Sequence, residues 1–441
     1  MPLVYPGLEF ANLLWSTVLF AAIYVLAYRR YIFSLFDPFN VALVTSIFAS
    51  VLMVNTVDDR RWWWQFFSFQ LAFFLGFSRN KLPPSSPIRA EGAGKAYFST
   101  LSEEMRVLEG AVALLFVVAL AANLYLGATA GFPIFAGDAG MAKVSAFVGG
   151  LGAVKRVNDG IGVFVPCAAL VLYACGRHKK WWLTVVLIEM ILSCLNGSKS
   201  AVLLFVCVLA TATRHEAFRT MAVTARLNQY ARRLMAAAVL WAIAVLGIEG
   251  GVGVGEAAWH FLVRIVFSGD MVLHYYHPDV IAHFAKYGPM TYLTDMLNPI
   301  LGFLRLVPYR EPLGYTMVGL LAGQNSPDTT VGPNTGFYVA GHIYFGAVGG
   351  FFYSMTIGYL VSFVRKLFFS PPKLGVIAFV SLLTLSIHIA VLPIDAQYFV
   401  SLLLDTFAPV GAALAIYYLA VVAATGVYGH DLSREAHPGW L

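Results

Sequence analysis

The sequence predicts an all-α polytopic membrane protein with about eleven transmembrane helices. Of its 441 residues, 59% are hydrophobic and only 12% are charged. Soluble globular domains carry about 25% charged residues. Apolar runs that reach or approach the ~20 residues needed to cross a bilayer recur along the whole chain. These runs lie near 9–28, 39–57, 62–78, 108–126, 160–176, 181–196, 200–213, 234–249, 336–362, 375–392 and 402–425.

The runs divide the chain into three parts. Residues 1–249 hold about eight spans, 250–335 form one large extramembrane segment, and 336–441 hold about three spans. Most Lys and Arg residues occur in alternate loops, such as "GRHKK" and "VRKLFFSPPK". The positive-inside rule places these loops in the cytoplasm, which puts the N-terminus outside and the C-terminus inside. Because the basic residues are spread among short loops, the net charge of +6 does not indicate a nucleic-acid partner.

The 250–335 segment is the first place to look for chemistry. A loop of this length is usually functional, and this one keeps its aromatic and aliphatic residues. Apolar residues at helical spacing predict amphipathic helices over 257–276 and 290–306, lying at the outer interface. The segment also mixes basic, acidic and histidine residues. That mixture suits a polar, anionic substrate held at the membrane surface.

Arg264 is the most informative cation of this segment, because "HFLVRIVF" surrounds it with apolar residues. Its guanidinium is expected either to bind a phosphate bidentately or to pair with a carboxylate of Asp270, Glu256 or Glu249. Other candidate anion-binding cations are Lys199, Arg305, Arg310 and Arg156.

Lys199 lies in "NGSKSA", a Gly/Ser turn between two apolar runs, where it either binds a phosphate or extends to the interface. Glu189, inside the preceding run, is expected to be its structural neighbour deeper in the bundle. Trp62, Trp63 and Trp64 stand at the start of a span, where interfacial anchors are typical.

His342 and His260 lead the candidate general bases, with Asp270 and Asp328 behind them. His342 lies in "GHIYFGAVGG", where it is either a hydrogen-bonded structural residue or a base beside a polar cavity. The histidines of "HYYHPDVIAH" are not spaced as metal ligands are, and we expect neither a metal nor another cofactor.

The layout of many spans with a large late loop, together with "NGSKSA" and "GHIYFGAVGG", resembles the Wzy-type O-antigen and oligosaccharide repeat-unit polymerases. The resemblance implies a GT-C-like fold and a metal-independent glycosyltransferase in the bacterial inner membrane. Its substrate would be a glycan on undecaprenyl diphosphate, transferred to another lipid-linked repeat on the periplasmic face. A possible chain-length regulator protein and the bilayer are the other partners that it implies. Members often have Arg where Lys199 stands and Glu near His342.

Two other functions fit the same sequence. One is an O-antigen ligase of the same superfamily, which the sequence barely separates from a polymerase. The other is a polysaccharide transporter or flippase. The absence of an internal repeat and of a pair of Gly/Pro-broken helices argues against a transporter, although Glu189 and Asp405 fall inside predicted spans.

Overall fold

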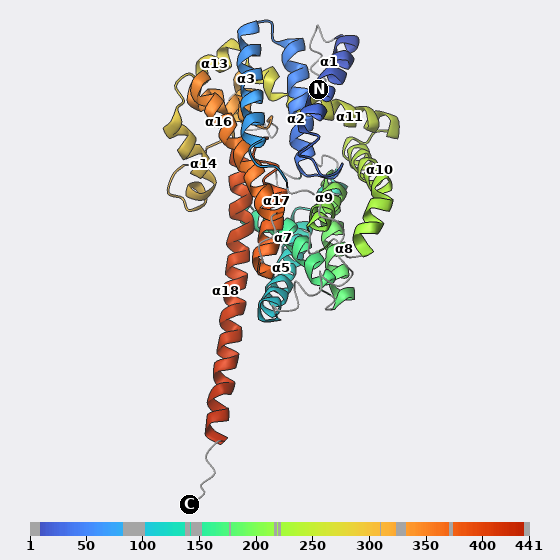
Figure 1. Cartoon of the computed structure of the whole chain (residues 1–441), viewed down its shortest axis with the longest axis vertical. Coiled ribbons are helices and arrows are strands. Elements are labelled where there is room, and N and C mark those ends of the chain that lie inside the picture. Colours follow the sequence, from blue (N-terminus) through green and yellow to red (C-terminus); the bar gives the residue numbers. More distant parts are fainter. Residues whose placement is uncertain are drawn as a thin grey trace, which may run out of the picture.

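The computed structural model shows an all-helical, multi-pass membrane protein (Figure 1). It describes residues 9–82, 102–136, 142, 152–175, 178–215, 218, 222–308, 310–322, 332–369 and 374–435. No strand occurs among these residues. The expected all-α membrane fold is therefore confirmed at this level.

Each of the expected apolar segments contains a helix. Eight lie before residue 251: α1 Phe10–Tyr28, α2 Phe39–Thr56, α3 Arg60–Phe77, α5 Ser102–Thr129, α7 Gly152–Ala174, α8 Lys179–Leu195, α9 Ala201–Arg214 and α10 Ala222–Gly250. Three follow residue 336: α16 Phe337–Phe369, α17 Val376–His388 and α18 Ala396–Glu435.

Within the described part of the chain, seven of these helices are long and apolar enough to cross a membrane: α1, α2, α5, α7, α10, α16 and α18. The others are α3, α8, α9 and α17. With 14 and 13 residues, α9 and α17 extend only about 20 Å each at 1.5 Å per residue, less than the ~30 Å hydrocarbon core.

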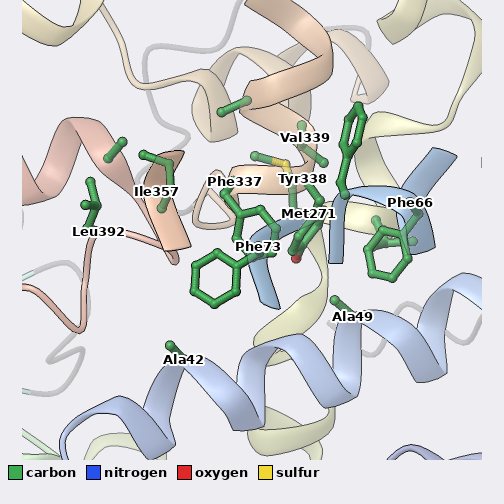
Figure 2. Close-up of a cluster of buried hydrophobic side chains, with 14 of the residues drawn as sticks. Ala42, Ala49, Phe66, Phe73, Met271, Phe337, Tyr338, Val339, Ile357 and Leu392 are labelled. Carbon is green, nitrogen blue, oxygen red and sulfur yellow. The ribbon is translucent and has the colours of Figure 1, made fainter. Parts of the chain in front are cut away.

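Two large hydrophobic cores hold the helices together. One joins α1, α2, α3 and α16 with the helices of the 250–335 segment, and the other joins α5, α7, α8, α9, α17 and α18. In Figure 1 the first group lies at the top, and α18 runs past the second group toward the C-terminus. Figure 2 shows the first core, where Phe73 of α3 lies beside Phe337 of α16, above Ala42 and Ala49 of α2. Between membrane helices such packing is stabilised by close van der Waals contact, because lipid tails are as apolar as these side chains.

The helix α16 is not the single straight span that the sequence predicted for 336–362. Gly346 has a left-handed φ of 66°, and the chain reverses there. A Cβ built on Gly341 would lie 3.2 Å from the Cα of Gly350, whereas these residues would stand about 14 Å apart in a straight helix. The helix therefore consists of a short first arm, 337–345, folded against a longer second arm, 347–369. The apolar run continues through the turn, which is why hydropathy alone missed it.

The first arm begins against the connection between α17 and α18. The Phe337 amide donates to the Pro393 carbonyl at 3.1 Å, and the Thr335 amide donates to a carboxylate oxygen of Asp395 at 3.4 Å. From there the arm follows α3 in the opposite direction, because Phe73 stacks on Phe337 and Phe66 meets Tyr338. This packing fixes both the start and the direction of the arm.

The 250–335 segment is largely helical where it is described. Its helices are α11 Val254–Val266, α12 Met271–Tyr275, α13 Pro278–Phe284, α14 Pro289–Phe303 and α15 Leu313–Leu321, with a 3-10 turn η2 at Phe267–Gly269. Helical structure is confirmed over 257–276, where α11, η2 and α12 follow one another, and α14 matches the helix expected over 290–306. The break falls at Gly269, whose Cβ would lie 2.2 Å from the backbone nitrogen of Ala49, so only glycine allows this contact with α2.

Candidate functional site

The first arm of α16 presents polar side chains on two faces. Tyr338 and His342, four residues apart, share one face and meet α3 and α12. Tyr344 points to the other side, where its hydroxyl donates to Asp295 of α14 at 2.7 Å. The arm therefore lies between two elements of the 250–335 segment.

His342 is held by two aromatic residues. Its Nδ1 is hydrogen-bonded to the hydroxyl of Tyr275, the last residue of α12. The ring of Trp62 lies edge-on to His342 with centroids 5.4 Å apart, and Trp62 also packs on Tyr276 at 5.5 Å. We call His342, Tyr275, Trp62, Asp270 and Arg264 the His342 site.

Asp270 lies at the other end of α12 from Tyr275, directly before its first residue. Burial raises the pKa of the Asp270 carboxyl to about 6, and the positive charge of Arg264 opposes this shift. Asp270 is also within electrostatic range of Tyr338 on the first arm. A carboxyl with a pKa raised in this way is better matched to general-base work than an ordinary aspartate is.

Arg264 itself is exposed, in the last turn of α11. The apolar residues that flank it in the sequence therefore do not enclose its side chain in the fold. Its electrostatic partner is Asp270, one of the three carboxylates expected. An exposed guanidinium beside a half-buried carboxylate remains available to an anionic ligand.

Three further polar groups of the same stretch are buried without a hydrogen-bond partner among the described residues. They are the hydroxyls of Ser268 and Tyr276 and Nδ1 of His274. Burial also lowers the pKa of His274, which favours its neutral form. Buried polar atoms are nearly always hydrogen-bonded, so water or ligand atoms are needed to satisfy these three.

His260 lies on α11, one turn before Arg264, and its side chain is 46% exposed. Its Nε2 stands 3.9 Å from a carboxylate oxygen of Glu256. His260 makes no contact with His342 among the described residues, so the structure does not bring these two candidate bases together.

Arg310 lies on the opposite face of the first arm from His342. Its Nη1 is 2.9 Å from Asp295, the same carboxylate that accepts from Tyr344. Arg305 is exposed and adopts a left-handed φ of 55° just after α14. Neither arginine is part of the His342 site.

Lys199 pairs with Glu249 rather than with Glu189. Its Nζ lies 2.5 Å from the Glu249 carboxylate at the end of α10. Gly197 has a left-handed φ of 67°, which makes the predicted turn between α8 and α9. Glu189 is buried in α8. The ion pair of Lys199 connects this turn to α10 and not to Glu189, the neighbour that was expected.

Arg156 lies apart from the His342 site, between α7 and α18. Its Nη1 stands 3.8 Å from the carboxylate of Asp405. Nearby, the amide of Asn123 joins α5 to Asn158 of α7 at 2.5 Å and accepts from Asn196 at 2.7 Å. These hydrogen bonds connect α5, α7 and the C-terminal end of α8.

Sequence reasoning did not select Tyr275, and it interpreted Trp62 only as an interfacial anchor. The one available signal was the aromatic pair inside "HYYHPDVIAH". Trp64, 79% exposed, still fits the role of an anchor. The remaining base candidate, Asp328, lies outside the described residues.

The described residues contain no group of three or more His, Cys, Asp or Glu side chains that could hold a metal ion. The fold and this site define the class: an all-helical multi-pass membrane protein with ionisable side chains where the 250–335 segment meets the first arm of α16. The chain matches no protein-family model, no curated protein and no solved structure.

Proposed function

We propose that the protein is a polymerase of lipid-linked oligosaccharide repeat units. It has a GT-C-like arrangement of about eleven spans in the bacterial inner membrane, with the N-terminus in the periplasm and the C-terminus in the cytoplasm. It transfers a glycan from undecaprenyl diphosphate to the sugar of a second lipid-linked repeat. The 250–335 segment lies on the periplasmic face, where both lipid-linked sugars are presented.

The reaction makes three chemical demands. The bond between the anomeric carbon and the diphosphate oxygen breaks, and its electron pair leaves with the diphosphate. An acceptor hydroxyl oxygen bonds to that carbon, and the hydroxyl proton passes to a base. The negative charge that develops on the diphosphate must be stabilised by positive charge or hydrogen-bond donors.

The His342 site offers one group for each demand. Arg264 is an exposed guanidinium that can bind a diphosphate through its planar fork. Asp270 and His342 are the groups that can exchange a proton. The observation that carries the proposal is that α12 links the two parts of the site: Asp270, the electrostatic partner of Arg264, precedes this helix, and Tyr275 at its end is hydrogen-bonded to His342.

Two alternatives use other features. A ligase would make the same bond to a different acceptor, so only the product separates it from a polymerase. A transporter is favoured by the Arg156–Asp405 pair between α7 and α18, because ionisable residues within spans often mark ion pathways. The folded-back α16 also qualifies the sequence argument against a transporter, since broken helices are found in such proteins.

Complementation of a strain that lacks this gene tests the proposal. The wild-type protein is expected to restore a ladder of long glycan chains. Arg264→Ala is expected to leave single repeats at normal membrane expression. Lys286→Ala, which removes an exposed cation of the same segment, is the matched control and should retain the ladder. An unchanged chain length in the deletion strain would reject the polymerase and bring the transporter forward.

A further inference from the structure

The hydrogen bond between Tyr275 and His342 has a direction that burial can decide. Tyr275 is 2% exposed, and its hydroxyl is bonded to Nδ1 of His342. A hydroxyl can donate or accept, and so can Nδ1, depending on which ring nitrogen carries the proton. The choice matters because it determines what His342 presents at its other nitrogen, Nε2.

Suppose first that Nδ1 carries the proton and donates to Tyr275. The tyrosine O–H would then need an acceptor of its own, and no other described residue provides one. A buried donor without a partner costs about 1–3 kcal/mol. If Tyr275 instead donates to an unprotonated Nδ1, both groups are satisfied at once.

We infer that Tyr275 donates to Nδ1 and is a positioning residue that keeps neutral His342 protonated at Nε2. An imidazole in this tautomer has no lone pair at Nε2, so His342 cannot take the acceptor's proton there. It is a hydrogen-bond donor to a substrate oxygen, as suits the developing charge of a diphosphate. The base is then Asp270. These chemical roles rest on the proposed function, whereas the tautomer does not.

The surroundings support a fixed ring. Trp62 contacts the imidazole from one side, and His342 belongs to a helix arm that is anchored at Phe337. Tyr275 ends α12, whose other end carries Asp270. The short helix α12 therefore carries Tyr275, which sets the tautomer of His342, at one end and the proposed base Asp270 at the other.

The tautomer can be measured directly by ¹⁵N NMR of the full-length protein in nanodiscs, with ring-labelled histidine. His342→Ala assigns the His342 resonances. We expect Nε2 to be protonated and Nδ1 to be a hydrogen-bond acceptor. Tyr275→Phe should shift the Nδ1 resonance. Tyr276→Phe should leave it unchanged, because that hydroxyl has no partner among the described residues. A protonated Nδ1 in the neutral wild-type protein, or no shift in Tyr275→Phe, overturns the inference.

Kinetics on a lipid-diphosphate-linked repeat then tests the role. Tyr275→Phe should lower kcat by about tenfold, the equivalent of one neutral hydrogen bond, with little change in KM. The acid limb of its pH profile should stay where wild type has it, because Asp270 sets that limb. A displaced acid limb would assign the base to His342 and overturn the donor role. If no variant polymerises glycan but the NMR result holds, the proposed function fails and the tautomer inference stands.

Discussion

Asp270→Asn should raise the stability of the protein and abolish its activity. Burial raises the pKa of the folded-state carboxyl from 3.8 to about 6. The folded protein therefore binds this proton more tightly than the unfolded chain does. Stability from this group is greatest below pH ~4 and is lost as the pH rises through about 6. Two pKa units correspond to about 3 kcal/mol, so the ionised carboxylate destabilises the folded state by about that amount at pH 8.

An asparagine carries no charge at either pH, so the substitution removes this cost. We expect Asp270→Asn to be more stable than wild type at pH 8 by up to about 3 kcal/mol and nearly unchanged at pH 4. Under the proposed function, activity should be lost at pH 8, because an amide cannot accept the proton that an ionised Asp270 takes. The assay is thermal unfolding of the purified protein in detergent at the two pH values, beside turnover of the lipid-linked repeat.

Asp279→Asn is the matched control, because the Asp279 side chain is 86% exposed in the same segment. It should change neither stability nor activity. A loss of stability in Asp270→Asn at pH 8, or an equal gain at both pH values, would refute the reasoning that burial dominates at this carboxyl.

Three predictions concern the packing of the fold. Arg365→Ala should lower the free energy of unfolding by about 3–5 kcal/mol, because it leaves Asp37 buried without the cation that now lies 2.5 Å away. Replacing both residues with apolar ones should restore stability. Thermal unfolding measures each variant. Gly269→Ala should cost about 1–3 kcal/mol and lower activity, since its Cβ must push α12 away from Ala49; normal turnover in this variant would contradict the placement of α12. Gly346→Ala should cost about 1–3 kcal/mol through the backbone alone, because its φ of 66° and ψ of −166° suit only glycine and nothing lies within 4 Å of the new Cβ. A gain in stability, as expected for Gly→Ala in an uninterrupted helix, would contradict the reversal of α16.

Hydropathy predicted where helices occur but not how α16 folds. A membrane segment is recognised by its average apolarity, and the run through Gly346 stays apolar on both sides of the reversal. The conformational signal is one glycine among several in "GHIYFGAVGG", and sequence alone does not show which one has a positive φ. The break at Gly269 has the same origin, since it reflects contact with a helix more than 200 residues earlier in the chain.

The site was predicted residue by residue but not as a constellation. Arg264, Asp270 and His342 were chosen as ionisable groups in apolar surroundings, which is a local property. Their partners are tertiary: Tyr275 is 67 positions from His342. The partner of Lys199 is also tertiary: it is Glu249 of α10 and not Glu189, ten positions before Lys199 in the sequence. Charge placement indicates that a partner is needed, and only packing decides which one.

The central claim is that the His342 site polymerises lipid-linked repeats. The most direct test places purified protein in liposomes with a single undecaprenyl-diphosphate-linked repeat and follows product length. We expect chains of increasing length with wild type and with Asp279→Asn, and single repeats with Asp270→Asn. Growth of chains at the wild-type rate by Asp270→Asn, or no chain growth by wild type, would contradict the central claim.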